Sequence, residues 1–166
     1  FWAQRQAGQP VLVPRRDLTL RGVQPLGRHG LESLPALGAK AAQLAQLTQF
    51  RLTRTSCPGP VRTPQDAFAL PLVHSLEHFA ASGAADYLDT QLADPEFLSN
   101  PARRAEGLAV VRSLVLEHPV DAALLAAIEQ AIQTRFGQAR VRLRSSSNTE
   151  DLPGFNGAGL YHSTSA

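Results

Sequence analysis

The chain contains no methionine, one cysteine and one lysine among its 166 residues. A single cysteine, Cys57, excludes an internal disulfide framework and any metal site built from several cysteines. This usage fits a reducing compartment, and we therefore expect a cytoplasmic protein. Because the sequence also lacks an initiator methionine, we expect it to be part of a longer protein.

Long apolar runs are absent as well. No stretch approaches the roughly 20 consecutive apolar residues that a membrane-spanning helix needs, and the start does not resemble a secretory leader. The formal net charge of +2 is too small to indicate a nucleic-acid or membrane surface. With 43% hydrophobic and 18% charged residues, the composition is that of one globular domain.

Lys40 is unusual because the other 15 basic residues are all arginine. A lysine kept in such a composition points to a position where a compact ammonium does what a planar guanidinium cannot. It also falls in the first turn of a predicted helix, where the dipole disfavours a cation unless an anion binds there as well. The alternative is an ordinary solvated lysine.

Apolar periodicity predicts a mainly helical chain. The expected helices cover residues 38–48, 72–83, 87–92, 102–117 and 121–136. Asp121 is the expected N-cap of the last helix and Gly137 its C-terminal stop. Residues 67–71 read as a short buried strand, whereas 51–65 and the stretch from Pro95 to Pro101 read as loops.

The last 27 residues change period. In residues 140–144, arginine alternates with Val141 and Leu143, which predicts a strand with one buried and one basic face. Asn156-Gly157 is a hairpin signal, and the return strand is expected to begin near residues 160–161. We therefore predict an α+β fold with helices packed on a small, mainly antiparallel sheet. Residues 1–34 form an irregular lead-in with at most one short strand, at 11–13.

Arg144 ends the predicted strand and is followed by three serines, residues 145–147. A guanidinium beside hydroxyls and turn amides suits bidentate contact with phosphate oxygens. Glycines 154, 157 and 159 would let the backbone approach an anion closely. Two alternatives remain open: an exposed hairpin with an arginine–carboxylate network that includes Glu150 and Asp151, or a nucleic-acid patch, although interleaved aromatics are missing.

Metal and nucleophile motifs give little signal. His74 and His78 lie one helical turn apart, but no acidic third ligand is obvious, so we predict no metal site in this chain. No Ser/His/Asp order and no GxxxxGK[ST] phosphate loop occurs.

The segment RLRSSSNTEDLPGFNGAGLY closely resembles the arginine motif in the N-terminal nucleotide-binding domain of pyruvate phosphate dikinases and phosphoenolpyruvate synthases. LGAKAAQLAQL is similar to the early Gly-Gly-Lys helix of the same family, and FALP at 68–71 resembles the segment after its proline-rich loop. The likeness covers about residues 35–166. Two positions depart from the family pattern: Ala39 stands in place of the second glycine, and His162 in place of an acid.

The resemblance implies that residues 35–166 are the first lobe of an ATP-grasp-type domain, truncated at its C-terminal end. It implies that Lys40 and Arg144 contact ATP phosphates, that Arg144 has the catalytic role, and that Ser145 belongs to the same site. The turn at Asn156 and Gly157, with the preceding phenylalanine, would border the phosphates as a mobile loop. Mg²⁺ ligands are expected outside these residues.

In the full-length family, ATP transfers its β-phosphate through a phosphohistidine to pyruvate, giving phosphoenolpyruvate. The implied partners are ATP and the downstream phosphohistidine and pyruvate-binding domains, with no nucleic acid and no membrane. No histidine of this chain lies in a phosphohistidine motif. Two alternatives are a non-catalytic ATP-sensing or interaction module of the same fold, and a relative with another acceptor, such as a glucan or an antibiotic.

Overall fold

A computed structural model describes residues 13–49, 63–64 and 66–149, and the backbone of residues 51–52, 59–60 and 163–165. This part of the chain is mainly helical, with three separate two-stranded antiparallel ladders. The α+β prediction is confirmed in that coarse sense. The prediction of one small sheet is wrong, because each ladder has only two strands and none joins another among the described residues.

The helices form two consecutive groups, and the strands that flank them are very short. The α-helices are α2 (Leu34–Leu37), α3 (Ala39–Gln49), α4 (Leu72–Ala81), α5 (Ala84–Leu92), α6 (Pro95–Ser99), α7 (Pro101–Glu117) and α8 (Ala122–Phe136), and the 3₁₀ helices are η1 (Leu26–Arg28) and η2 (Leu31–Ser33). The strands are β1 (Gln24–Pro25), β2 (Arg51–Leu52), β3 (Gly59–Pro60), β4 (Phe68–Ala69), β5 (Arg142–Arg144) and β6 (Ser163–Ser165).

The five predicted helices are confirmed as α3, α4, α5, α7 and α8. The ends of α8 follow from its caps. The carboxylate of Asp121 accepts a hydrogen bond from the amide of Leu124 at 2.8 Å, and Gly137 ends the helix at a φ of +56°. Local sequence therefore decides where this helix begins and ends.

The predicted loop between Pro95 and Pro101 is wrong, because α6 lies there. Each proline occupies the start of a helix, where its missing N–H costs no hydrogen bond. Asp94 caps α6 through the amide of Glu96 at 2.9 Å, and Asn100 caps α7. The two prolines thus begin α6 and α7 instead of enclosing a loop.

The short buried strand predicted at residues 67–71 is confirmed in part: β4 covers only Phe68–Ala69, is half-buried and pairs antiparallel with β1. The loop predicted over residues 51–65 holds a further ladder, in which β2 pairs with β3, so that prediction is wrong at both positions. Of the strand expected at residues 11–13, only Val13 is described, and it is irregular and 79% exposed.

The arginine-rich strand is shorter than predicted and has no buried face. β5 pairs antiparallel with β6, with Leu143 opposite Thr164 and Arg144 opposite Ser163. All three β5 residues are exposed, Leu143 by 49%. Alternation predicted a covered face, but burial requires a packed neighbour, which a pattern within one strand cannot reveal.

The core is a small cluster around α2 and α3. Leu26 and Leu37 are 3% and 0% exposed and pack with the alanines of both helices. Leu20 packs against this cluster. Leu20 and Leu26 belong to the predicted lead-in, residues 1–34, and α3 lies beyond the predicted domain boundary at residue 35. Both sides of that boundary therefore contribute to one core.

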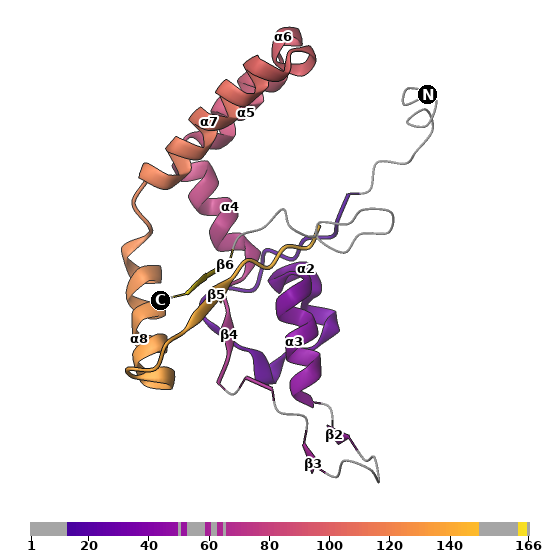
Figure 1. Ribbon diagram of the computed structural model, residues 1–166, viewed down its shortest axis with the longest axis vertical. Helices are drawn as coiled ribbons and strands as arrows, with labels where there is room; N and C mark the ends of the chain where they lie inside the picture. Colours follow the sequence, from indigo (N-terminus) through magenta and orange to yellow (C-terminus); the bar gives the residue numbers. More distant parts are fainter. Residues whose placement is uncertain are drawn as a thin grey trace.

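Figure 1 shows α5, α6 and α7 as a helical arm that α4 joins to the core, while β5 and β6 cross between α8 and the α2–α3 pair. Phe97 of α6 is 2% exposed and packs on Gly107 of α7. Among the residues of α7 only Gly107 is buried, and α8 has no buried residue; Leu108 and Leu125 are 47% and 44% exposed. None of the described helices is both long and apolar enough to cross a membrane.

Candidate functional site

The first turn of α3 lacks a capping side chain of its own. Gly38 ends α2, where its amide donates to the carbonyl of Leu34, and its carbonyl accepts the amide of Ala42 as α3 begins. The first amides of a helix have no partner within it and are usually satisfied by a Ser, Thr, Asp or Asn side chain at this position. A glycine cannot supply one.

The serine run after β5 caps this helix from 105 residues away. The hydroxyl of Ser146 accepts a hydrogen bond from the amide of Ala41 at 3.0 Å and donates one to the carbonyl of Leu37 at 2.7 Å. The carbonyl of Ser147 accepts the amide of Ala39 at 2.9 Å. The segment that follows β5 and Arg144 is therefore joined directly to the start of α3, which carries Lys40.

The close approach of the two segments occurs at Gly38. A Cβ built on this residue would lie 2.6 Å from the main-chain carbon of Ser146 and 2.6 Å from its hydroxyl oxygen, and the φ of Gly38 is +80°. Ala39, which replaces the second glycine of the family pattern, is 1% exposed. Of the two glycines in the family pattern, only the first, Gly38, is therefore needed for the close contact with Ser146.

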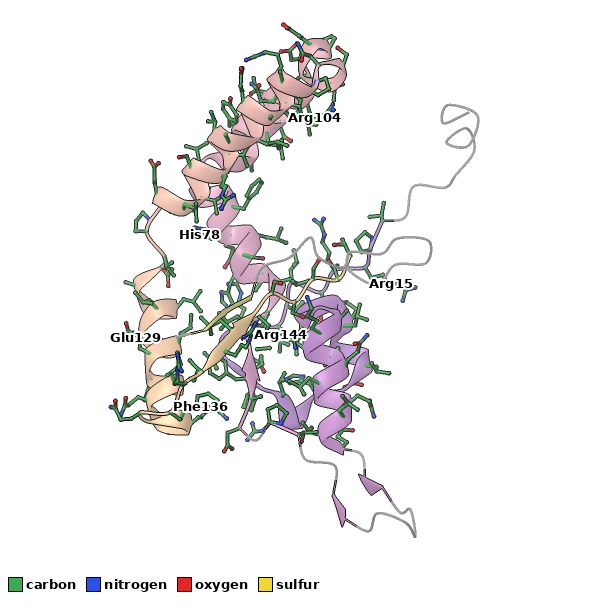
Figure 2. The ribbon with its side chains drawn as sticks, viewed as in Figure 1. Arg15, His78, Arg104, Glu129, Phe136 and Arg144 are labelled. Atoms are coloured by element: carbon green, nitrogen blue, oxygen red, sulfur yellow. The ribbon has the colours of Figure 1, made fainter. Side chains whose placement is uncertain are left out.

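The structure brings three of the five sequence-predicted site residues into one region. Lys40 is half-buried and lies between Ala39 and Ala41, which both bond to the serine run. Arg144 is exposed at the end of β5, the strand that Figure 2 shows crossing between α8 and the α2–α3 pair. Ser145 follows directly, and its buried hydroxyl has no hydrogen-bond partner among the described residues.

Two of the α3 amides are not available to an anion. Free amides at a helix start can assist an anion, but those of Ala39 and Ala41 are bonded to the serine run. The hydroxyl of Ser146 is not available to an anion either, because it accepts from the amide of Ala41 and donates to the carbonyl of Leu37. A phosphate here would therefore depend on side chains, chiefly the two cations and Ser145.

Gly38, Ser146 and Asn148 hold the site together, and sequence reasoning gave none of them an individual role. Asn148 is 9% exposed and donates from its side-chain amide to the carbonyl of Arg15 at 2.7 Å. The available signal was a helix beginning after glycine, which needs a cap from elsewhere. The residues that accept these amides lie too far along the chain to be identified by pattern.

The other predicted site residues, Asn156 and Gly157, lie outside the described residues, as do Glu150 and Asp151. No group of three or more His, Cys, Asp or Glu side chains in the described part could hold a metal ion. His74 and His78 are used structurally: His74 accepts the amide of Gly22 at 2.8 Å, and His78 lies 2.9 Å from the carbonyl of Val115.

A cavity of about 350 Å³ lies at the opposite end of α3. Thr48, near the last residue of that helix, lines it together with Arg28, Asp66 and Arg135. None of the predicted site residues that the structure describes borders it. The candidate site lies at the hydrogen-bonded contact at Ser146, because that contact joins the segments that carry the residues predicted to bind phosphate, and the cavity does not.

Comparison with known proteins gives no relative: no protein-family model, no curated protein and no solved structure matches this chain.

Proposed function

We propose that this chain is the ATP-binding portion of a dikinase-type phosphotransferase, in the first lobe of an ATP-grasp-type domain. Lys40, Arg144 and Ser145 would contact the ATP phosphates, and Arg144 would act on the transferred group. In this proposal, as the family resemblance implies, Mg²⁺ would be held by residues outside these 166. The protein would act in the cytoplasm.

The observation that supports this proposal most strongly is the contact between α3 and the serine run. The bonds from Ala39 to Ser147 and from Ala41 to Ser146 join the helix start that carries Lys40 to the strand end that carries Arg144. Two cations that are far apart in sequence thus belong to neighbouring backbone segments. A polyphosphate is a ligand that two such cations can share.

The buried hydroxyl of Ser145 is a second argument for a ligand. Buried polar atoms are nearly always hydrogen-bonded, so an unpartnered hydroxyl calls for a specific explanation. A phosphate oxygen beside Arg144 would accept a hydrogen bond from the hydroxyl of Ser145. The residues present therefore fit an anion, although the engaged amides of α3 leave its binding to side chains.

The chemistry of this chain would be electrostatic. Phosphoryl transfer requires little covalent assistance from the protein, and its rate depends on positioning and on stabilising the charge that moves between the phosphates. The guanidinium of Arg144 can bind two oxygens at once, and the ammonium of Lys40 acts as a compact charge. The backbone segments that carry the two cations are joined by hydrogen bonds before any ligand arrives, which lowers the cost of reorganisation.

The experiment uses the full-length protein that contains these residues, incubated with pyruvate and ATP labelled on its β-phosphate. We expect label in phosphoenolpyruvate, formation of AMP, and loss of turnover in Arg144→Ala with the circular-dichroism spectrum unchanged. Arg140→Ala is the matched control, since it removes the same charge before β5 and should retain activity.

Two outcomes would favour the alternatives. ATP binding without turnover on any acceptor would indicate the ATP-sensing or interaction module. Label in a glucan or an antibiotic, with pyruvate unused, would indicate a relative with a different acceptor. Wild-type turnover in Arg144→Ala, or no ATP binding by the wild-type protein, would contradict the assignment itself.

A further inference from the structure

We propose that Ser146 is a positioning residue for nucleotide binding. It holds the start of α3, which carries Lys40, against the end of β5, which carries Arg144. This inference rests on the proposed function. Ser146 would not touch the nucleotide. Its hydroxyl would act through the backbone on both sides, and ATP affinity would depend on it for that reason.

The hydroxyl of Ser146 has one bond on each side of the break between α2 and α3. It donates to the carbonyl of Leu37, the last residue of α2, at 2.7 Å, and accepts from the amide of Ala41 in α3 at 3.0 Å. One side chain thus fixes the turn in which Lys40 lies. Because Leu37 is completely buried, the anchor is the core itself.

The strand end is fixed by the same contact. Ser146 follows Arg144 by two residues, so a shift of its hydroxyl would displace the backbone that carries the guanidinium. Asn148 holds the far side of the segment through the carbonyl of Arg15. The position of Arg144 relative to Lys40 therefore depends on a hydroxyl that is fully used within the protein, in contrast to the hydroxyl of Ser145, which lacks a partner among the described residues.

The test compares Ser146→Ala and Ser146→Thr with Asn100→Ala in the full-length protein. Asn100→Ala is a matched control: it removes an uncharged helix cap, from α7, away from the site. ATP affinity is measured by calorimetry and the exchange rate of the Ala41 amide by NMR. If Ser146→Ala does not fold, Ser146→Cys, which keeps the shape and weakens the hydrogen bonds, replaces it.

We expect Ser146→Ala to speed exchange at Ala41 and to weaken ATP binding by about fivefold to tenfold, the effect of losing one or two hydrogen bonds. Ser146→Thr keeps the hydroxyl and should restore most of the affinity. Asn100→Ala should lower thermal stability without changing the affinity.

Three results would overturn the inference. The first is faster exchange at Ala41 with ATP affinity unchanged in Ser146→Ala, while Arg144→Ala still abolishes binding; the proposed function would then stand and the positioning role would not. The second is an equal loss of affinity in Asn100→Ala, which would indicate general destabilisation. The third is absence of ATP binding in the wild-type protein, which would end the proposed function as well.

Discussion

Gly38 and Ser146 approach so closely that a Cβ on the glycine would lie 2.6 Å from the main-chain carbon of the serine. The contact joins the break between α2 and α3 to the segment after β5. It allows no side chain at residue 38, and the φ of +80° disfavours one independently.

Gly38→Ala should therefore lower the free energy of unfolding by at least about 2 kcal/mol, because backbone strain and overpacking add. Gly83→Ala separates the two effects, since Gly83 has a φ of +74° and a Cβ added there would meet no atom within 4 Å. That variant should lose only about 1 kcal/mol. Urea unfolding measures both, and equal losses would show that the contact with Ser146 is not tight.

Gly107→Ala should destabilise the helical arm, although alanine is the better helix former by about 1 kcal/mol. The new Cβ would lie 2.7 Å from a ring carbon of Phe97, which is 2% exposed and cannot easily move. We expect a net loss of about 1–2 kcal/mol. The measurement is urea unfolding of the single variant.

A double-mutant cycle identifies the cause. In a Phe97→Leu background the ring is gone, and Gly107→Ala should then be neutral or stabilising. If Gly107→Ala costs the same free energy in both backgrounds, the clash with Phe97 is not the reason for its effect.

Glu77 should titrate at higher pH in Arg21→Gln. The hydrogen bond from Arg21 is the main cause that holds the pKa of Glu77 below its usual value, and the charge of Arg21 also contributes. The folded-state pKa is lowered, so the pair stabilises the protein above the ordinary carboxyl pKa. That contribution is lost as the pH falls through the folded-state pKa.

NMR titration of the Glu77 carboxyl carbon measures this change, with Arg104→Gln as the control. Arg104 is in α7, and its guanidinium donates to the carbonyl of Leu98. Its loss should leave the pKa of Glu77 unchanged. An unchanged pKa in Arg21→Gln would show that the exposed pair does not persist in solution.

The helices were largely predictable because their signals are local. α8 is set by Asp121, an apolar period and Gly137, all visible in sequence. α6 was missed because Pro95 can end one segment or begin another, and the capping role of Asp94 decides between them. Short-range chemistry therefore predicts the helices and, read more closely, would have predicted this one too.

The site was predictable only in part. Lys40 and Arg144 stand out in the sequence, but the bonds that join their segments run from Ala41 to Ser146 and depend on tertiary packing. The exposure of Leu143 was missed for a related reason: alternation shows which face of a strand is apolar, and not whether another element covers it.

The most direct test of the central claim measures ATP binding to the full-length protein by calorimetry. It compares the wild type with Lys40→Ala, Arg144→Ala, the double variant and Arg140→Ala. If the two cations share one triphosphate, each single variant should bind at least about tenfold more weakly, the losses should not add in the double variant, and Arg140→Ala should bind normally. Wild-type affinity in either Lys40→Ala or Arg144→Ala would contradict the account.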